Sequence, residues 1–445
     1  MKPSFAPFRE KMQSAGMSAA AMAAFERSFS LLARNESGLI PESSIHPVEE
    51  LPTYEQISHE KEDGGVLAKA VMLKLNGGLG TGMGLEKAKS LLPVRDGNTF
   101  LDLIVRQVLA ARKEMGANLR FLLMNSFSTT EDTRAHLARY PELGDPANLE
   151  LLQNKVPKIT VDTLAPIEWP ADPDLEWCPP GHGDLYPAIL GSGMLDRLIE
   201  EGYLYLFVSN SDNLGATMDP ALLNWFASSD MPFLMEVTAR TGADRKGGHL
   251  AKRASDGQLL LRESAQCSEE DMGAFQDIDR HRYFNTNNLW LRLDRLAEAL
   301  DRNGGLLPLP VIRNKKTVDP RAKKSPPVYQ LETAMGAAIE CFPGAGAVVV
   351  PRTRFAPVKT TADLLALRSD AYVISDDGRA MLAPARKGIP PEIELDGDHF
   401  KLVDQLDAAL TDGVPSLLHC RKLTVRGPVH FSASDRFEGD VDIEA

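Results

Sequence analysis

A glycine-rich run that follows a short apolar segment has the composition of a phosphate-binding loop. Val71–Leu75 is mostly apolar and predicts a buried strand, and five glycines follow between Gly77 and Gly84, with Lys89 shortly after them. Glycine lets the backbone approach a ligand closely, so that free N–H groups can point at phosphate oxygens. The run therefore predicts a binding site for a phosphate ester directly after a strand.

The spacing of this run excludes two common enzyme classes. The run is not closed by Gly-Lys-Ser/Thr, as the P-loop of an ATPase would be. Met83 stands where the dinucleotide fingerprint starting at Gly78 would need its last glycine. A kinase-type ATPase and a nicotinamide-dependent oxidoreductase are both disfavoured.

Further apolar segments also end in polar loops, which indicates how the glycine run is positioned. Phe121–Met124, Tyr203–Val208 and Ala347–Val350 each predict a strand, and polar loops follow them, the second loop containing Asp212. Strands that alternate with helical stretches predict an α/β fold, a mainly parallel, Rossmann-like sheet with helices on both faces. Ligands bind such sheets at the carboxyl ends of the strands.

The glycine run resembles a known family over its whole length. Leu75–Gly84 reads Leu-Asn-Gly-Gly-Leu-Gly-Thr-Gly-Met-Gly, and Lys89-Ser90 follows. It is similar to the nucleotide-binding loop of the eukaryotic-type UDP-glucose pyrophosphorylases, and the resemblance continues from about Leu73 to Tyr372. It implies a nucleotidyltransferase that joins UTP and glucose 1-phosphate into UDP-glucose and pyrophosphate, with Mg²⁺ as cofactor.

The resemblance also implies which residues hold the nucleotide. Gln153 matches the glutamine that reads the uracil edge, Gly181 in Pro179–Asp184 lets the base lie against the backbone, and Asp212 in Ser209–Gly215 helps to hold Mg²⁺. The remaining matches are the loop residues that position the nucleotide and the lysines that meet its phosphates: Leu75, Asn76, Gly77, Gly78, Lys89 and Lys359.

Other matching positions are expected to bind the sugar phosphate. His182 can donate a hydrogen bond to a phosphate or hydroxyl group, and amides such as that of Asn210 suit sugar hydroxyls. Asn285 and Asn287 lie in the segment Phe284–Trp290, which resembles the sugar-binding strand. Glu332 matches a glutamate near the hexose and is expected at the start of a helix.

The implied reaction needs cations more than it needs a general base. The sugar phosphate is already an anion near neutral pH, because the second pKa of a phosphate monoester is about 6. Two unit charges ~4 Å apart repel by about 4 kcal/mol at an effective dielectric near 20, so bringing two phosphates together requires compensating charge. We expect Mg²⁺, Lys89 and Lys359 to supply it.

The ends of the chain predict two additional segments around the catalytic domain. Residues 1–65 are expected to be a helical segment with a connector, because Met22, Phe25, Phe29 and Leu32 form one apolar face. The catalytic domain is expected at 66–380 and a small C-terminal left-handed β-helix at 381–445. The six-residue repeat that predicts the β-helix comprises Val425, Phe431, Phe437 and Ile443, with Gly427, Ala433, Gly439 and Ala445.

Composition limits the partners of the protein. A formal net charge of −13 and a pI of about 5.3 disfavour a nucleic-acid partner. The four cysteines show no metal-ligand spacing, and no apolar run approaches the ~20 residues of a membrane span, so neither disulfides nor a membrane is expected. We expect a cytoplasmic protein, with the C-terminal domain as a possible surface for homo-oligomers.

Two alternatives stay open at the level of the sequence. A related pyrophosphorylase could act on N-acetylhexosamine 1-phosphate or on several sugar phosphates, although Asn76 and Met83 favour the glucose enzymes. A catalytically silent sensor of nucleotide sugars could keep the same fold, but the presence of Lys89, Asp212 and Lys359 together disfavours it.

Overall fold

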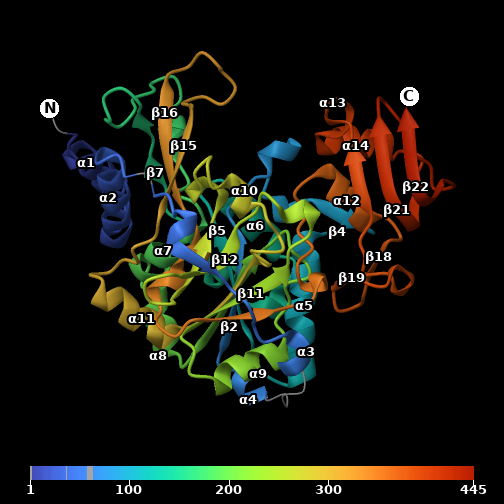
Figure 1. Ribbon diagram of the computed structural model, residues 1–445, viewed down its shortest axis with the longest axis horizontal. Coiled ribbons are helices and arrows are strands. Elements are labelled where there is room, and N and C mark those ends of the chain that lie inside the picture. Colours follow the sequence, from blue (N-terminus) through green and yellow to red (C-terminus); the bar gives the residue numbers. More distant parts are fainter. Residues whose placement is uncertain (1–2, 37, 58–63, 445) are drawn as a thin grey trace. The chain divides into compact units, whose positions relative to one another are not determined.

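The computed structural model describes residues 3–36, 38–57 and 64–444 (Figure 1). Ala445, the last small residue of the expected repeat, lies outside them. The chain divides into two compact units. The first unit comprises Met1–Leu73, Glu150–Val208 and Ala221–Val350, and the second comprises Lys74–Leu149, Ser209–Pro220 and Pro351–Ala445. The expected domain boundaries at 65 and 380 stay a prediction.

The largest sheet is mixed and has ten strands in the described part of the chain. Its main path runs β1-β12-β14-β10-β2-β5-β6, while β11 pairs with β14 and β17, and β13 pairs with β12. The four strands expected from the sequence are present as β2, β5, β10 and β17. The strand bounds are β1 Ile45–Pro47, β2 Ala70–Asn76, β5 Arg120–Asn125, β6 Glu150–Leu152, β10 Tyr205–Asn210, β11 Phe233–Ala239, β12 His249–Arg253, β13 Leu259–Arg262, β14 Tyr283–Arg292 and β17 Gly346–Val349.

The sequence predicts a mainly parallel sheet, and around β14 the pairing is instead antiparallel. This strand is antiparallel to β10, β11 and β12, whereas β11 and β17 are parallel. An apolar run indicates that a strand is buried on both faces. A central antiparallel strand is buried in the same way as a parallel one, so the run does not reveal the strand direction. The sequence pattern therefore located the strands but not all of their directions.

The remaining strands form small sheets. Residues 311–333 make a hairpin of β15 and β16, to which β8 adds (Figure 1). The bounds are β3 Pro93–Arg95, β4 Asn98–Thr99, β7 Val156–Pro157, β8 Ile159–Thr160, β9 Trp177–Cys178, β15 Val311–Thr317, β16 Pro327–Thr333, β18 Tyr372–Ile374 and β19 Ala380–Leu382.

Helices α1 (Ala6–Ser14) and α2 (Ala19–Ala33) confirm the predicted N-terminal helical segment. Ser18 caps α2, since its Oγ accepts a hydrogen bond from Ala21 N at 3.1 Å. The buried apolar face of the two helices packs in one cluster with residues of β7, β8, β9 and β16: Phe8, Met12, Phe25, Phe29, Leu32, Val156, Ile159, Cys178 and Leu331. The N-terminal helices thus brace the strands that lead into the candidate site of the first unit.

The other helices cover the two units. Helix α5 is amphipathic and begins with a capping box between Thr99 and Asp102. The bounds are α3 Tyr54–Ile57, α4 Gly64–Leu67, α5 Phe100–Met115, α6 Thr130–Leu137, α7 Leu185–Gly191, α8 Met194–Glu200, α9 Pro220–Ser228, α10 Met272–Phe275, α11 Leu293–Arg302, α12 Thr361–Arg368, α13 Gly397–Phe400 and α14 Val403–Ala409.

The C-terminal segment forms a parallel sheet of three strands, β20 (Glu392–Leu395), β21 (Ser416–Arg426) and β22 (Arg436–Glu444) (Figure 1). Val425 pairs with Ile443, three steps of the six-residue repeat further along the chain. The repeat therefore marks residues that stack from strand to strand. The three strands pair in parallel, and α13 and α14 lie between β20 and β21.

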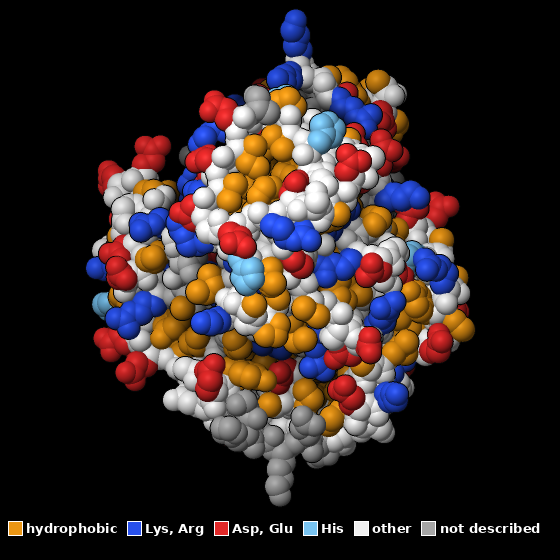
Figure 2. Space-filling model, turned by 90° about the vertical axis from the view of Figure 1, so that its right-hand side faces the viewer, with side chains coloured by type: hydrophobic (Ala, Val, Ile, Leu, Met, Phe, Trp, Pro, Cys, Tyr) orange, Lys and Arg blue, Asp and Glu red, His pale blue; other side chains and the backbone are white. Residues whose placement is uncertain are grey.

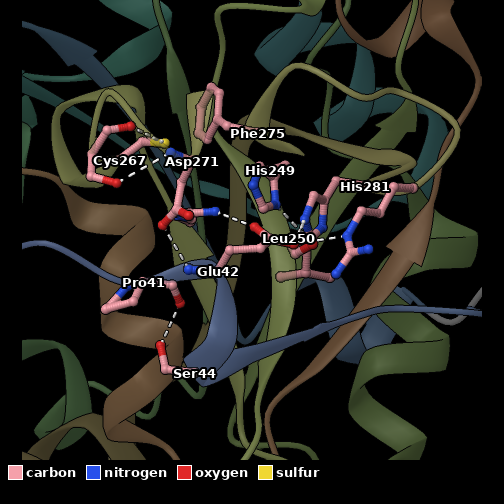
Figure 3. A network of polar contacts seen from close by, with 12 residues as sticks. Pro41, Glu42, Ser44, His249, Leu250, Cys267, Asp271, Phe275 and His281 are labelled. Atoms are coloured by element: carbon pink, nitrogen blue, oxygen red, sulfur yellow. Dashed lines mark hydrogen bonds and ion pairs between the residues drawn. The ribbon is translucent and has the colours of Figure 1, made fainter. Parts of the chain in front are cut away.

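A buried network of charged residues fastens β1 to the sheet of the first unit (Figure 3). Arg262 is fully buried and donates hydrogen bonds to Glu42 Oε2 at 2.5 Å and Asp271 Oδ2 at 3.1 Å. His281 contacts Glu42 at 3.0 Å and stacks on His249, with ring centroids 3.8 Å apart. Burial lowers the pKa of His249 to about 2, so this ring stays neutral.

Charge on the visible face is mixed, and the four thiols are free. Figure 2 shows acidic and basic side chains interspersed over the visible face, with no large basic patch on it. Cys178, Cys267, Cys341 and Cys420 are free thiols, as expected. Within the described ranges, every helix is too short or too polar to cross a membrane.

Candidate active site

The glycine loop of the second unit follows β2, as the sequence predicts. Gly80 and Gly84 adopt positive φ values of 69° and 78°, a conformation that glycine adopts without strain. The loop is closed by hydrogen bonds from Met83 N to Gly80 O at 2.8 Å and from Lys89 N to Gly78 O at 3.1 Å. Met83 is buried, so it anchors the loop from inside.

Asn76 contributes to this loop through its backbone only. Its side chain is buried and donates to Asn125 Oδ1 at 2.7 Å and to Thr133 Oγ1 at 3.0 Å. Ser126 Oγ donates to Gly77 O at 2.9 Å, and Ser211 N donates to Leu75 O at 3.1 Å. These contacts fix the end of β2, so that the glycine backbone after it is held in place.

Lys89 and Asp212 form the central ion pair of this unit. Lys89 Nζ lies 2.7 Å from Asp212 Oδ2, and the two side chains are 16% and 18% exposed. Asp212 Oδ1 is buried and has no hydrogen-bond partner among the described residues. Because one carboxylate oxygen has no partner among the described residues, it can bind a cation. Lys89 can also leave Asp212 and pair with an anionic ligand.

Lys359 is held next to the Asp212 segment by the backbone. Val358 N donates to Asp212 O at 3.1 Å, and Asn213 pairs with Pro357 in an isolated bridge. Lys359 itself is exposed, and its Nζ lies 5.9 Å from the ring centroid of Phe355. As expected, it follows β17 and precedes α12.

Asp212 suits a magnesium ion that is held mainly by phosphates. A hard cation such as Mg²⁺ takes oxygen ligands and keeps several waters, so one carboxylate plus phosphate oxygens is sufficient. The unpartnered Oδ1 supplies that carboxylate oxygen. Within the described ranges, no group of three or more His, Cys, Asp and Glu side chains could hold a metal by itself.

In the first unit, Gln153, Gly181 and His182 form a second cluster. Gln153 Nε2 donates to Gly181 O at 2.9 Å. Gly181 has a φ of +79°, and a Cβ atom there would lie 2.5 Å from Thr333 O, so any other residue would clash. The glycine is thus required by both its conformation and its close packing.

His182 accepts a hydrogen bond from the backbone in this cluster. Met335 N donates to His182 Nδ1 at 3.0 Å, so the ring proton of the neutral form is on Nε2. Burial lowers the pKa of His182 to about 4, so the ring is neutral at physiological pH. Nε2–H can therefore donate to a substrate oxygen without changing its charge.

Asn285 and Asn287 stand at a bulge of β14. The pairing with β11 shifts between Glu236 and Val237, and Asn287 adopts a φ of +60°. Asn285 Nδ2 donates to Asn287 Oδ1 and Asn287 N donates to Asn285 Oδ1, both at 2.9 Å. These two hydrogen bonds thus fix the orientation of Asn285 and Asn287 relative to each other.

The prediction that Glu332 starts a helix is wrong. Glu332 lies in β16, and the following 3₁₀ helix begins only at Met335. Its Oε1 accepts a hydrogen bond from Asn314 Nδ2 of β15 at 2.8 Å. The apolar pattern after Glu332 belongs to that short helix. Residues of β16 do not alternate regularly between buried and exposed, so the strand was not recognised from the sequence.

The candidate residues fall into one group in each unit. The second unit holds Leu75, Asn76, Gly77, Gly78, Lys89, Asn210, Asp212 and Lys359. The first unit holds Gln153, Gly181, His182, Asn285, Asn287 and Glu332. Asn210 ends β10, and its carbonyl accepts from Asn213 N at 3.2 Å.

Two residues that support these groups were missed. Asp184 belongs to the Pro-Pro-Gly-His-Gly-Asp motif but received no role; it is buried and binds Asn154. Glu236 is fully buried in β11 and accepts from Asn288 Nδ2 and Trp290 Nε1, both at 2.9 Å. The single acidic residue within an apolar strand was the one sequence signal for Glu236.

A glycine loop after a strand, a lysine–aspartate pair at the end of a second strand and a polar cluster rich in amides define an α/β nucleotidyltransferase. Comparison with known proteins agrees. The model of the family described as UTP–glucose-1-phosphate uridylyltransferase matches residues 22–436. The chain belongs to the UTP–glucose-1-phosphate uridylyltransferase family.

Individual relatives cover most of the chain. The uridylyltransferase of Saccharomyces cerevisiae is 42% identical over 396 residues, 89% of this chain and 78% of the relative. That of Solanum tuberosum is 39% identical over 412 residues, 92% and 82% of the two chains.

Solved structures are similar over nearly the whole length. A single-residue mutant of UDP-glucose pyrophosphorylase from Leishmania major, in complex with UDP-glucose, is 50% identical with a TM-score of 0.94, covering 100% of this chain and 95% of that one. The enzyme from Trypanosoma brucei is 50% identical with a TM-score of 0.92, covering 98% and 94%.

Proposed function

We propose that this protein transfers the uridylyl group of UTP to glucose 1-phosphate and releases pyrophosphate. The observation that carries the proposal is the Lys89–Asp212 pair beside the glycine loop, in a chain of the uridylyltransferase family. A phosphate oxygen of the sugar phosphate bonds to the α-phosphorus of UTP, and the bond from that phosphorus to the β-phosphate oxygen breaks. No proton has to move, so no catalytic base is needed.

The residues of the second unit act on the phosphates in this proposal. The glycine backbone holds the triphosphate, and Lys89 exchanges its contact with Asp212 for one with a phosphate oxygen. Lys359 is exposed, so it can move to neutralise the α-phosphate and the incoming sugar phosphate. Lysine charge aimed at the reacting phosphates lowers the barrier by electrostatic stabilisation.

Mg²⁺ is part of the proposal, with Asp212 as its protein ligand. When bound, the ion would neutralise phosphate charge and align the reacting groups. Asp212 Oδ1 is suited to this role because it is buried and unpartnered within the described residues. The ion pair with Lys89 orients the carboxylate.

The residues of the first unit read the base and the sugar. Gln153 and Gly181 are proposed to contact uracil, and His182 to donate from Nε2 to the sugar phosphate. The amides of Asn285 and Asn287 and the carboxylate of Glu332 suit hexose hydroxyls. Glucose 1-phosphate rather than an N-acetylhexosamine phosphate is the proposed substrate, as in the named relatives.

We also propose that the parallel strands β20, β21 and β22 belong to a small left-handed β-helix. The pairing of residues three repeat steps apart supports it. Assembly through this segment and a cytoplasmic location stay predictions from the sequence.

The proposal is tested by measuring pyrophosphate release from the purified protein with Mg²⁺ and UTP. Omitting the sugar phosphate, or replacing it with N-acetylglucosamine 1-phosphate, provides the controls. We expect release that depends on UTP, Mg²⁺ and glucose 1-phosphate. Bound UDP-glucose without any turnover would instead identify a sensor, and equal turnover with both sugars would overturn the assignment to glucose.

A further inference from the structure

Asp184 is a buried carboxylate whose hydrogen bonds, among the described residues, come from Asn154. It ends the 3₁₀ helix His182–Asp184, and its side chain is 4% exposed. Asp184 Oδ2 accepts from Asn154 N at 2.7 Å, and Asn154 Nδ2 donates to Oδ1 at 3.0 Å. Both donors therefore come from the residue that directly follows Gln153.

The loop that contains Asp184 also holds the side chain of Gln153. Gly181 O accepts a hydrogen bond from Asp184 N at 3.2 Å and another from Gln153 Nε2 at 2.9 Å. Asp184 thus fixes the backbone of the Gln153 segment through Asn154, while Gly181 fixes the amide at its tip. Each end of Gln153 is tied to the same short loop.

These ties give the Gln153 amide a single orientation. If the amide turned over, its Oε1 would face Gly181 O, and two acceptors would oppose each other. In the observed orientation, Oε1 and the second N–H of Nε2 have no partner among the described residues, so they remain for a ligand. An amide locked in this way can distinguish a base by its pattern of donors and acceptors.

Asp184 has little electrostatic support from its surroundings. Asp184 lines a pocket in which Arg27 of α2 and Tyr186 of α7 are the other charged or titratable side chains among the described residues, and His182 lies on its own 3₁₀ helix. Arg27 donates instead to Leu309 O at 2.5 Å, and His182 is neutral. Asn154 is thus the partner that orients the carboxylate.

We propose that Asp184 is a positioning residue for base selectivity, which holds Gln153 in the one orientation that reads uracil. The inference rests on the proposed use of UTP. Uracil presents an N3–H donor beside carbonyl acceptors, which match Oε1 and the free N–H of Gln153. Cytosine presents an unprotonated N3 and an amino group, so it would require the turned-over amide.

Weakening the hydrogen bonds between Asp184 and Asn154 should lower the selectivity for UTP over CTP. In Asp184→Asn, one acceptor oxygen becomes an amino group that faces the donors of Asn154, so Gln153 gains freedom. We expect the ratio of kcat/KM for UTP over CTP to fall by about tenfold or more, through a higher KM for UTP rather than a lower kcat. Asn154→Ala keeps the backbone donor and loses the side-chain donor, so the ratio should fall in the same direction by about threefold.

The experiment measures pyrophosphate release with both nucleotides at about pH 8, above the pKa of Asp184, for wild type, Asp184→Asn, Asn154→Ala and Asp196→Asn. Asp196→Asn is the matched control, because it makes the same chemical change at an exposed position on α8. We expect the control to keep the wild-type ratio. If Asp184→Asn does not fold, Asn154→Ala decides the question.

If Asp184→Asn keeps the wild-type ratio of kcat/KM for UTP over CTP, this inference is overturned, while the proposed function is unaffected. The same holds for Asn154→Ala if Asp184→Asn does not fold. A loss of kcat with no change in the ratio also overturns it, because that pattern indicates a general structural role. If the wild type shows no turnover with UTP and glucose 1-phosphate, the proposed function fails, and the inference fails with it.

Discussion

Lys89 Nζ lies 2.7 Å from Asp212 Oδ2, while the other oxygen of the same carboxylate is buried without a partner among the described residues. The pair joins the glycine loop to the end of β10 within the second unit. One carboxylate thus orients Lys89, which we propose to bind phosphate, and keeps an oxygen that could bind a cation. We therefore expect substitution of Asp212 to affect both proposed roles.

Replacing Asp212 with Asn should impair both of these tasks. The amide cannot offer a charged ligand to Mg²⁺ and no longer orients Lys89 by charge. We expect kcat to fall by about 100-fold or more, with a higher Mg²⁺ concentration needed for half-maximal rate. Titrating Mg²⁺ against initial rate measures both effects. Asp132→Asn is the matched control, since Asp132 forms only a 3.8 Å contact with the exposed Lys87; an equal loss in the control would contradict the assignment.

Replacing Lys359 with Gln should lower the rate but not the stability. Lys359 is exposed, and its charge is proposed to act on the α-phosphate. We expect kcat to fall by about 100- to 1,000-fold with an unchanged melting temperature. Lys87→Gln, at a lysine that is 72% exposed, should retain near-normal turnover. Normal turnover in Lys359→Gln would remove this residue from the mechanism.

Asp184 should make stability depend on pH in a defined direction. Burial raises the pKa of Asp184 from 3.8 to about 7. Between these values the folded state binds more protons than the unfolded state, so the contribution of Asp184 to stability falls as pH rises from about 4 to 7. The full effect is on the order of a few kcal/mol, at about 1.4 kcal/mol per pKa unit.

Asp184→Asn isolates this contribution, because the amide does not titrate. We expect the free energy of unfolding of wild type, minus that of the variant, to be lower at about pH 8 than at about pH 5. Urea denaturation at both values measures the difference. His182, whose pKa is lowered to about 4, is present in both proteins, so its effect cancels. A difference that does not change with pH would contradict the raised pKa.

Glu236 should support the bulge of β14, which we propose to bind the sugar. Its carboxylate accepts from Asn288 Nδ2 and Trp290 Nε1, which follow the Asn285–Asn287 pair in β14. In Glu236→Gln one of these donors would face an amino group, which should cost about 1–3 kcal/mol of unfolding free energy. We also expect a higher KM for glucose 1-phosphate than for wild type, with the KM for UTP little changed.

Urea denaturation and steady-state kinetics check both parts of that prediction. Glu298→Gln is the control, because the Glu298 side chain is 54% exposed and pairs with Arg295 three residues away. If Glu236→Gln is as stable as wild type and binds the sugar phosphate equally well, the supporting role is wrong.

Local features of the sequence were predicted well. The glycine loop, the strands β2, β5, β10 and β17 and helix α2 follow from short-range composition and periodicity. Gln153, His182 and Lys359 were identified as candidate site residues because they lie in motifs that resemble those of the family. The structure confirms that Lys359 follows a strand and precedes a helix.

Features that depend on distant partners were not predictable in the same way. The bond between Asn154 and Asp184 joins residues 30 positions apart, whereas Glu42 reaches Arg262 and His281 across 220 and 239 positions. No periodicity encodes which buried polar groups will pair. Glu332 was misplaced because the residues after it read as helical, whereas its own conformation is set by pairing with β15.

In the proposed reaction an oxygen of glucose 1-phosphate attacks the α-phosphorus of UTP, and an isotope experiment tests this step. Glucose 1-phosphate that carries ¹⁸O in its phosphate oxygens is converted with unlabelled UTP and Mg²⁺, and both products are analysed by mass spectrometry. We expect all of the label in UDP-glucose and none in pyrophosphate. Label in pyrophosphate, or no UDP-glucose at all, would contradict it.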